Sequence, residues 1–514
     1  MSIDLRPQSP PAPLPLSAIA AACDLTTAGP GGPAQPPPSG SPDVTVTGVT
    51  HDSRAVRPGD LFAALPGEHA HGAAYAEQAR ERGAVAILTD ADGAEMVSDL
   101  PLLIAEDPRE ALGAVAAEIY RHPARDLLLI GVTGTNGKST VVHLLEAGLQ
   151  AAGYRTGIIG TTGVRIGDVD VPNERTTPEA PDLHALLARM VEEGVTAVAM
   201  EVSSHALVLG RVNGLVYDSA IFTQLSQDHL DFHGTMEDYF AAKASLFTAA
   251  RSRQAVIGID GMWGRRLADH CEIPQITYAL DEDADVVCAS VIPSPTGQAL
   301  TIRDASLPGV TFEAEVGLPG RFNAANALGA WTALRAVGVL PEVLTTAMAD
   351  VRVPGRMEMI DEGQDFTAIV DYAHSPDAVE RIISSVLPRG RRIVVLGCGG
   401  DRDREKRFAM GDVAAAGADI LIVTDDNPRS EDPASIRAAM LAGANSVGGD
   451  IREIGDRREA IEAAVALAEP GDVLLLLGKG HEQGQEVAGV VTHFDDREQL
   501  RAAIHMARRG GRSA

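Results

Sequence analysis

Short apolar runs alternate with longer segments of helical periodicity through most of this chain. The runs cover residues 127–132, 195–200, 219–222 and 254–259 in the middle third, and 367–370, 393–396, 420–423 and 473–477 in the last third. This alternation predicts an α/β protein with mostly parallel sheets wrapped by helices. Most runs lead into a polar cluster, and open α/β sheets bind ligands beyond the carboxyl ends of their strands. We therefore expect these clusters to converge on a shared crevice.

The chain is too long for a single core, and its patterns divide it into three domains behind a tail. Residues 1–43 contain 11 of the 31 prolines, so we expect a mostly mobile tail with a short docking helix at 16–23. An N-terminal α/β domain is expected over 44–125, a central domain over 126–352 and a C-terminal domain over 353–514. Catalysis is expected between the domains.

Composition narrows the classes of function. Acidic side chains outnumber basic ones by 71 to 43, a formal net charge of −28, which argues against nucleic-acid binding. An anionic substrate would need local clusters of arginine and lysine. The four cysteines form no C-x-x-C pair, and no apolar run approaches the roughly twenty residues that span a bilayer. We expect a cytoplasmic monomer without disulfides or membrane insertion.

A glycine loop between an apolar run and a helical segment predicts a nucleotide site. The backbone N–H groups of such a loop face phosphate oxygens, Lys138 adds a cation, and the Ser139 hydroxyl suits Mg²⁺. A simple glycine turn before a helix is the structural alternative. The predicted ATP-binding loop consists of Gly134, Thr135, Asn136, Gly137, Lys138, Ser139 and Thr140. It is a variant loop, because a strict G-x-x-x-x-G-K-[ST] motif would require glycine in place of Val132.

The loop resembles that of the Mur ligases, which form amide bonds with ATP during synthesis of the peptidoglycan stem peptide. Folylpolyglutamate synthetases share a similar loop. The resemblance covers residue 44 to the end, and it implies a central P-loop-type ATPase domain and a Rossmann-like C-terminal domain. The other motifs of the chain have to separate the two branches.

Two polar clusters after central runs suit a magnesium ion beside the nucleotide. Glu201 follows the second run, and Asp228, His229 and Asp231 follow the third. Such residues are often ordinary loop or capping residues, but carboxylate and imidazole groups next to a phosphate loop suit Mg²⁺. The resemblance assigns Glu201 and His229 as metal ligands together with Ser139, and leaves the two aspartates structural.

A lysine on the next helical segment is the most specific expectation. Thr235 can cap that helix with Asp238 at capping-box spacing, and Lys243 follows on it. A solvated lysine is the ordinary interpretation. The resemblance implies instead a carbamylated lysine (N6-carboxylysine), formed when the neutral amine adds CO₂, whose anion lies by Mg²⁺. The expected catalytic residues are therefore Lys138, His229 and Lys243.

The resemblance also implies contacts to ATP and to a uridine-diphosphate precursor. For ATP these are Asn326 near the purine, Arg356 on phosphate and Asp371 on ribose, although Asn323 and Asn326 could equally cap or pack a helix. Ser53, in a first-domain triplet that could also be a common turn, is expected to hold the uridine-diphosphate end. The expected contacts to the peptidyl part are Arg175, Thr176, Thr177, Ser203 and Arg211. Related sequences carry glutamine where this chain has Leu209, which leaves one precursor contact in doubt.

Charged motifs after three C-terminal runs predict a pocket for an amino acid. Arginine forks suit carboxylates and Glu482 suits an ammonium, so the pocket fits a zwitterion with an extra carboxylate. The expected residues are Arg402, Asp426, Asn427, Pro428, Arg429, Gly478 and Glu482. The tetrapeptide at 426–429 could be a simple turn. It also matches the motif of the Mur branch that adds 2,6-diaminopimelate, where Arg429 would attract a carboxylate and exclude the distal ammonium of lysine.

The resemblance to the diaminopimelate-adding branch implies a specific reaction, and three alternative functions have to be compared with it. The D-glutamate side-chain carboxylate of UDP-N-acetylmuramoyl-L-Ala-D-Glu would become an acyl phosphate before the amine of diaminopimelate attacks. A folylpolyglutamate-type ligase would not need the first-domain segment or the 426–429 motif. A P-loop kinase or GTPase disagrees with the loop spacing at Val132. A non-catalytic binding protein would be expected to lose Lys138, Glu201 or Lys243, and all three are present.

Overall fold

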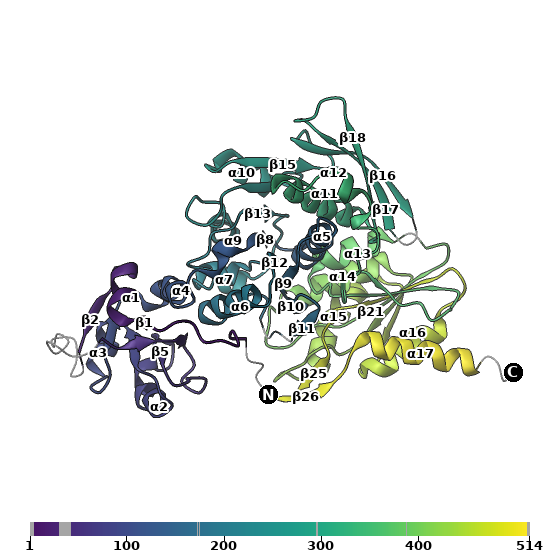
Figure 1. The fold of residues 1–514 in the computed structure, drawn as a ribbon. Helices are drawn as coiled ribbons and strands as arrows, with labels where there is room; N and C mark the ends of the chain where they lie inside the picture. Colours follow the sequence, from purple (N-terminus) through teal and green to yellow (C-terminus); the bar gives the residue numbers. More distant parts are fainter. Residues whose placement is uncertain are drawn as a thin grey trace.

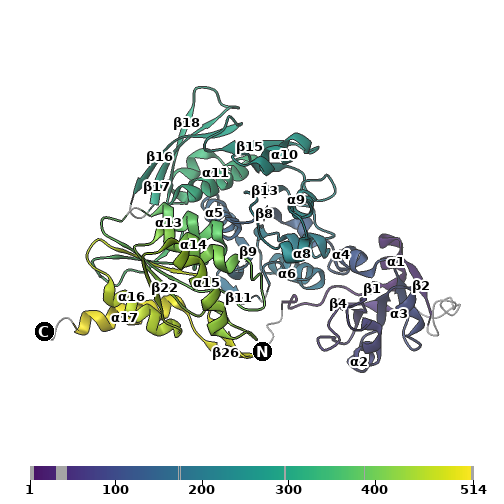
Figure 2. The ribbon, with the colours of Figure 1, turned by 180° about the vertical axis from the view of Figure 1, so that it is seen from behind.

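The computed structural model describes residues 5–29, 43–171, 173, 175–294, 297–386 and 388–510. Three α/β lobes follow one another along the chain, from the purple N-terminal lobe through the teal central lobe to the green and yellow C-terminal lobe (Figure 1). The view from behind shows the central lobe between the other two (Figure 2). Among the described residues, no helix combines the length and apolar character needed to cross a bilayer. The predicted α/β class with several domains is confirmed.

An 11-stranded sheet forms the centre of the molecule. Its strands run in the order β11 (Val169–Val171), β10 (Gly163–Ile166), β9 (Thr156–Gly160), β12 (Ala197–Glu201), β8 (Leu128–Thr133), β13 (Ser219–Phe222), β14 (Ala255–Gly258), β15 (Gln275–Ala279), β16 (Val286–Ser294), β17 (Gly297–Asp304) and β18 (Thr311–Val316). The strands from β9 to β16 in this order are parallel. The predicted apolar runs correspond to β12, β8, β13 and β14, whereas β9, β15 and β16 were not predicted. The antiparallel strands at both edges were not predicted, because their alternating polar residues lack the continuous apolar runs of buried parallel strands.

Helices cover both faces of the central sheet. One face packs against α5 (Lys138–Ala151), α11 (Arg321–Ala336) and α12 (Pro341–Ala347) around the buried Trp331. The other face packs against α6 (Ala180–Glu192), α7 (Ser204–Val208), α9 (Met236–Ala244) and α10 (Met262–His270). The short helix α8 (Leu230–His233) precedes α9. Burial on both faces explains why the central strands consist almost entirely of apolar residues.

The C-terminal domain has the predicted Rossmann-like arrangement. Its sheet runs in the order β19 (Glu358–Met359), β20 (Thr367–Asp371), β24 (Val473–Leu477), β21 (Arg392–Leu396), β22 (Ile420–Val423) and β23 (Asp450–Glu453), parallel except for β19. One face is covered by α13 (Pro376–Ser385), α14 (Lys406–Gly417) and α15 (Pro433–Val447), and the other by α16 (Arg457–Leu467) and α17 (Asp496–Gly510). A hairpin of β25 (Gly484–Val487) and β26 (Val490–His493) follows β24.

The N-terminal domain is a smaller sheet with helices around it. Its strand order is β2 (Thr26–Ala28), β7 (Leu102–Ile104), β6 (Ala86–Thr89), β5 (Asp60–Ala63) and β4 (Gly48–Thr50), and β1 (Leu14–Pro15) pairs separately with β3 (Thr45–Val46). Its helices are α1 (Leu16–Cys23), α2 (Ala76–Glu81), α3 (Ala91–Glu95) and α4 (Pro108–Ile119), with 3₁₀ turns at Gly72–Tyr75 and Pro123–Asp126.

The predicted mobile tail over residues 1–43 needs correction in its described part. Residues 1–4 and 30–42 lie outside the described residues. Within the rest, β1, α1 and β2 belong to the N-terminal domain, because Leu14, Leu16 and Ile19 are buried in its core. The docking helix at 16–23 is confirmed as α1. The prediction of a tail was based on the high proline content. It overlooked the three apolar side chains that pack into the core.

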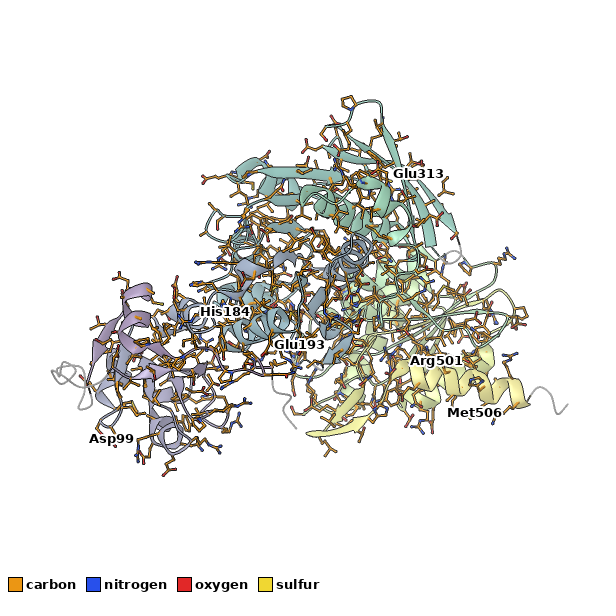
Figure 3. All side chains as sticks on the ribbon, viewed as in Figure 1. Asp99, His184, Glu193, Glu313, Arg501 and Met506 are labelled. Carbon is orange, nitrogen blue, oxygen red and sulfur yellow. The ribbon has the colours of Figure 1, made fainter. Side chains whose placement is uncertain are left out.

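The N-terminal domain meets the central domain along helices α4 and α6. His184 on α6 is completely buried, and its Nε2 lies 3.0 Å from the carbonyl oxygen of Asn213. It lies inside the molecule, whereas Asp99, Glu313 and Arg501 lie on the outside of the three lobes (Figure 3). Burial lowers the pKa of His184 to about 4, so its ring is neutral at physiological pH.

Candidate functional site

A cleft of about 940 Å³ lies between the central and C-terminal domains. Its central walls come from the phosphate loop after β8 and from the segments that follow β12 and β13. Its C-terminal walls come from the loops after β20, β21, β22 and β24. The carboxyl ends of two parallel sheets therefore face each other across a shared cavity, which is the convergence expected from the sequence.

The phosphate loop follows β8 and turns into the start of α5. Gly137 has φ 90°, and a Cβ there would lie 2.3 Å from Asn326 Oδ1, so only glycine fits. Lys138 Nζ donates to the carbonyl oxygens of Gly134 and Thr135 at 2.9 and 2.8 Å. Burial lowers the pKa of Lys138. Thr135 to Thr140 line the cleft, whereas Gly134 does not.

A buried carboxylate lies directly beneath the loop. Glu201, at the end of β12, accepts from Ser139 Oγ at 2.8 Å and from the backbone N–H of Thr161 at 2.8 Å. Thr161 Oγ1 donates to its other oxygen at 3.1 Å. Glu201 and Ser139 are thus in contact, as a shared metal site requires. Thr161 was missed in the sequence, although a hydroxyl at the end of β9 was the available signal.

His229 and Lys243 approach the loop from the side of α8 and α9. His229 has a left-handed backbone (φ 54°), a strained conformation that is concentrated at functional sites. Burial lowers its pKa to about 4 despite the neighbouring Asp228 carboxylate, so the imidazole is neutral. Its ring lies 4.9 Å, between centroids, from that of His205.

Lys243 is buried beneath the loop. Its Nζ donates to the carbonyl oxygen of Gly134 at 2.9 Å and lies 4.6 Å from the centre of the Tyr239 ring. Burial, and then the charge of Lys138, lower the pKa of Lys243 well below its ordinary value. The solvated lysine that the sequence left open is therefore wrong. Lys243 does not line the cleft itself.

The C-terminal domain contacts the phosphate loop directly. Arg356 Nη2 lies 3.4 Å from Ser139 Oγ, and its guanidinium stacks 4.2 Å from the centre of the Tyr372 ring. Asp377 Oδ2, in the first turn of α13, accepts from Ser226 Oγ at 3.0 Å and from Asn136 Nδ2 at 3.4 Å. Tyr372 directly follows Asp371 in the chain and had no predicted role. The stacking shows that it orients the arginine.

The remaining predicted nucleotide contacts also face the cleft. Asn326 on α11 lines it beside Gly137, and its Nδ2 donates to Asn323 Oδ1 at 3.1 Å. Asp371, at the end of β20, accepts from the backbone N–H groups of Met357 and Ala373 at 2.7 and 2.8 Å. Burial raises the pKa of Asp371. Trp263 and Tyr278 also line the cleft. They were not predicted, because they belong to no recognisable motif in the sequence.

A cluster of arginines around one carboxylate lines another wall. Glu179 is buried and pairs with Arg211 at 2.9 Å, with Arg175, and with Arg109 at 3.6 Å. Arg211 also donates to the carbonyl oxygen of Thr177 at 3.4 Å. Glu179 alone cannot neutralise three guanidinium groups, and two of them, Arg175 and Arg211, face the cleft. This is the local basic site that the composition called for.

Some of the other residues predicted to contact the precursor line the cleft, and the rest do not. Thr176 Oγ1 lies 3.0 Å from Thr161 Oγ1, and both line the cleft with Ser203. Thr177 lies behind them and donates to the carbonyl oxygen of Glu201 at 2.9 Å. Ser53 is in the N-terminal domain, away from the cleft, and donates to Gln78 Oε1 at 2.6 Å.

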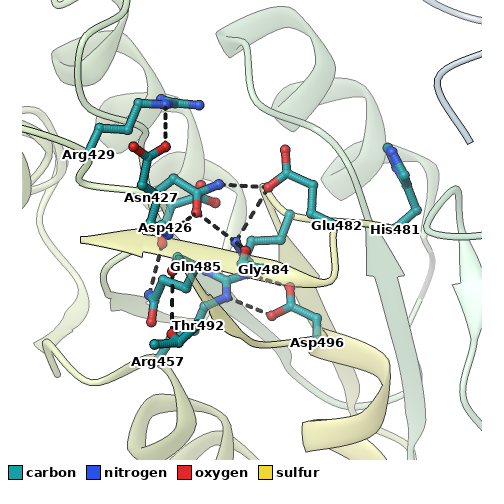
Figure 4. A network of polar contacts seen from close by, with 12 residues as sticks. Asp426, Asn427, Arg429, Arg457, His481, Glu482, Gly484, Gln485, Thr492 and Asp496 are labelled. Atoms are coloured by element: carbon teal, nitrogen blue, oxygen red, sulfur yellow. Dashed lines mark hydrogen bonds and ion pairs between the residues drawn. The ribbon is translucent and has the colours of Figure 1, made fainter. Parts of the chain in front are cut away.

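Four of the residues predicted to bind the amino acid, Asp426, Asn427, Arg429 and Glu482, lie in a network of polar contacts after β22 and β24 (Figure 4). Asn427 Nδ2 donates to Glu482 Oε2 at 2.7 Å, and Arg429 Nη1 donates to the carbonyl oxygen of Gly400 at 2.6 Å. Gly478 has φ 113°, and a Cβ there would lie 2.6 Å from Asp426 Oδ2. Burial and the neighbouring Asp426 raise the pKa of Glu482. Arg402 lines the cleft nearby, whereas Pro428 does not.

Sequence comparisons agree with this geometry. Residues 45–120 match the description "Mur ligase family, catalytic domain", 132–334 match "Mur ligase middle domain" and 355–480 match "Mur ligase, glutamate ligase domain". A relative from Streptomyces coelicolor, named UDP-N-acetylmuramoyl-L-alanyl-D-glutamate–2,6-diaminopimelate ligase, is 53% identical over 478 residues, covering 91% of this chain and 94% of its own. This chain belongs to the Mur ligase family.

Two further Mur ligases show how far the similarity extends. A relative of the same name from Geobacillus thermodenitrificans is 44% identical over 475 residues, covering 90% of this chain and 96% of its own. A solved structure, also titled as the 2,6-diaminopimelate ligase, has 33% identity and a TM-score of 0.65, covering 90% of this chain and 96% of that one. The resemblance inferred from the loop and strand-end motifs is therefore confirmed.

Proposed function

We propose that this chain is an ATP-dependent ligase that joins 2,6-diaminopimelate to the D-glutamate side-chain carboxylate of UDP-N-acetylmuramoyl-L-Ala-D-Glu. The observation that carries the proposal is the shared cleft, in which Lys138 of the phosphate loop and Arg429 of the amino-acid pocket line the same cavity. An acceptor held by the C-terminal domain can thus reach a carboxylate activated in the central domain. The curated relatives, which match along 90% and more of their own length, bear the same activity in their names.

The phosphate loop would hold ATP, and Ser139, Glu201 and His229 would hold a Mg²⁺ ion that neutralises phosphate charge. The donors fit this hard cation, because Ser139 Oγ and the Glu201 carboxylate are already 2.8 Å apart and the neutral His229 ring can add a nitrogen. Among the described residues, no group of three or more His, Cys, Asp or Glu side chains forms a metal site by itself. Phosphate oxygens and water would complete the coordination. The purine, phosphate and ribose would contact Asn326, Arg356 and Asp371.

Lys243 is proposed to carry a CO₂-derived carbamate. Its buried amine has a lowered pKa, which supplies the neutral form that adds CO₂. The carbamate would put an anion in place of the neutral amine, next to Lys138, and would offer oxygen ligands to Mg²⁺. Carbon-13 NMR after incubation with labelled bicarbonate should show a carbamate signal that Lys243→Ala lacks. Its absence from the native protein would reject the modification.

Reaction at the carboxylate requires a leaving group better than oxide. The γ-phosphoryl group is transferred to the D-glutamate side-chain carboxylate, giving an acyl phosphate, while Lys138 and Arg356 stabilise the transferring charge. The amine then attacks, and inorganic phosphate leaves. Domain closure around Arg356 and Asp377 would keep water away from the acyl phosphate. Transfer of labelled oxygen from the substrate carboxylate into phosphate tests this route.

The precursor spans the remaining positive wall. Its peptidyl carboxylates are placed against Arg175 and Arg211, whose charges Glu179 only partly neutralises. The uridine-diphosphate end is placed on the N-terminal domain near Ser53. Leu209, at the end of α7, is only partly exposed and offers no polar side chain for this substrate. We place the enzyme in the cytoplasm as a monomer, where the nucleotide precursor and ATP are both available.

The test is an ADP-release assay with substrates omitted one at a time. Release should require both the uridine dipeptide precursor and diaminopimelate, with little turnover when lysine replaces the latter. If ADP is released as fast with lysine as with diaminopimelate, the assignment to the diaminopimelate-adding branch is wrong. Release without any precursor would point to a different ligase or an ATPase. Separate assays of the meso and LL isomers would then define the acceptor.

A further inference from the structure

We propose that Lys479 is a positioning residue that fixes Asn427 and Glu482 for recognition of the incoming amino acid. This inference rests on the placement of diaminopimelate at Asn427, Arg429 and Glu482 proposed above. Lys479 is completely buried and does not line the cleft, so it acts through its neighbours (Figure 4).

The ammonium of Lys479 has three acceptors, one for each of its protons. Its Nζ donates to the carbonyl oxygen of Gly484 at 2.6 Å, to Asn427 Oδ1 at 3.2 Å and to Glu482 Oε2 at 3.4 Å. A buried ammonium is stable only when it is paired and hydrogen-bonded, and this one is. The lysine therefore joins the loop after β22, the loop after β24 and the first residue of β25.

These contacts determine which way the amide of Asn427 points. Its Oδ1 accepts from Lys479 Nζ and from the backbone N–H of Glu486 at 3.0 Å, so its Nδ2 must face Glu482. The reversed amide would direct an N–H₂ group at two donors. Asn427 Nδ2 and Lys479 both donate to Glu482 Oε2. Glu482 lines the cleft, and its Oε1, which takes part in neither of these bonds, is then left for a substrate ammonium.

The same lysine compensates charge in an acidic pocket. Asp426 is 7% exposed and lies near Glu482, whose pKa it helps to raise. The other buried cation nearby, Arg457, is paired at 2.7 and 2.6 Å with Asp496. Without Lys479, Glu482 would lose its closest cation, and its carboxylate would turn away or take up a proton. Either change would remove the anion that holds the amino-acid ammonium.

The experiment compares Lys479→Met with Arg391→Met in the full chain. Methionine matches the length of the lysine stem without the charge, and Arg391 pairs with Asp472 at the opposite end of the same sheet. Lys479→Met should raise KM for diaminopimelate at least tenfold, with KM for ATP within twofold and kcat less affected. Arg391→Met should leave all three parameters close to wild type.

A double-variant cycle separates positioning from a loss of packing. If Lys479 acts through Asn427, then Lys479→Met and Asn427→Ala together should raise KM for diaminopimelate no more than the larger single change. Effects that multiply, or an equal rise in KM for ATP, would overturn the inference. If Lys479→Met does not fold, Asn427→Asp keeps the lysine but sets a carboxylate against Glu482. It should raise KM for diaminopimelate selectively, and an unchanged KM would overturn the inference.

Arg429→Ala distinguishes this inference from the proposed pocket. If Arg429→Ala leaves KM for diaminopimelate unchanged, the pocket itself is misplaced. If Arg429→Ala raises that KM and Lys479→Met does not, the pocket stands and only the role of Lys479 is rejected.

Discussion

Arg429 shows how one side chain receives its geometry from a distant part of the chain. Its backbone is left-handed (φ 54°), a costly conformation for arginine. The conformation is held by hydrogen bonds on both sides, from Arg429 N–H to the carbonyl oxygen of Glu486 at 3.0 Å and from Ala488 N–H to that of Arg429 at 2.7 Å. The tetrapeptide at 426–429 was recognisable in the sequence. Its conformation was not, because it depends on pairing with β25.

Replacement of Arg429 by alanine should weaken and broaden acceptor selection. The guanidinium is expected to bind the distal carboxylate of diaminopimelate, and a bidentate ion pair of this kind contributes about 2 kcal/mol, or roughly thirtyfold in KM. Steady-state kinetics with diaminopimelate and with lysine would measure the change. Arg404→Ala is the matched control, since Arg404 is exposed, pairs with Glu431 and does not line the cleft. An unchanged ratio of diaminopimelate to lysine turnover would contradict the role of Arg429.

His184 predicts an acid-dependent loss of stability in the central domain. Burial lowers its pKa in the folded protein from the ordinary 6.5 to about 4, so the unfolded chain binds more protons between these pH values. Stability should fall as pH decreases from 6.5 toward 4, by up to roughly 3 kcal/mol from this residue. His184→Gln can still donate to Asn213 and should reduce that loss, as measured by thermal unfolding across this pH range.

An exposed histidine gives the opposite sign and serves as the control. A hydrogen bond to Glu498 raises the pKa of His493, so its contribution is present at low pH and is lost as pH rises. His493→Gln should therefore not reduce the acid loss. Other buried histidines remain in both variants and cancel in the comparison. Equal acid sensitivity of His184→Gln and the native protein would reject the interpretation.

At the scale of elements, the parallel strands with long apolar runs were predictable, whereas β9, β15 and the edge strands were not. The apolar runs at 219–222 and 420–423 coincide with β13 and β22, because burial on both faces leaves an uninterrupted apolar run. The hairpin β25–β26 and the strands β16 to β18 carry exposed residues such as Val490 and Ile292, and their register is set by partners. Local sequence therefore gave the sheets that present the site, but not the hairpin that holds Arg429.

Helix α9 was predicted together with its cap, and the cap has a measurable role. Thr235 Oγ1 accepts from the backbone N–H of Asp238 at 3.1 Å and donates to Asp238 Oδ2 at 2.7 Å. Thr235→Ala should destabilise the helix that carries Lys243 by about 1 kcal/mol. Hydrogen exchange of the α9 amides would measure this. Thr346→Ala makes the same chemical change inside α12 at an exposed position, where alanine is the better helix former. If Thr235→Ala and Thr346→Ala reduce hydrogen-exchange protection equally, each in its own helix, the proposed role of Thr235 as a helix cap is wrong.

At the scale of the whole molecule, the composition predicted that positive charge must be concentrated in local clusters. It did not predict how the domains are joined. A net charge of −28 indicated a basic wall, and Arg175, Arg211 and Glu179 form it. The contacts of Arg356 and Asp377 with the loop join residues more than one hundred positions apart. No local pattern encodes such pairs, because they depend on how two finished domains dock.

The N-terminal strap, residues 5–13, offers a test of domain orientation. Arg6 makes two hydrogen bonds of 2.9 Å to Asp60 in the first domain. The backbone N–H groups of Gln8 and Ser9 donate to Glu192 of α6 at 2.6 and 2.9 Å, and Leu5 packs on the central core. The strap therefore connects the N-terminal domain, proposed to bind the uridine-diphosphate end of the precursor, to the central domain, where the carboxylate of the precursor is proposed to be activated.

Removal of residues 1–9 should loosen that connection without disturbing the ATP site. KM for the uridine precursor should rise about threefold to tenfold, as expected for loss of these four hydrogen bonds, which are exposed or partly buried, whereas nucleotide affinity should stay constant. Small-angle scattering should show a broader distribution of domain separations. Glu192→Gln weakens only the hydrogen bonds to Gln8 and Ser9 and should shift KM in the same direction by a smaller amount. A truncated protein with native scattering and native precursor KM would show that α4 and α6 alone set the orientation of the first domain.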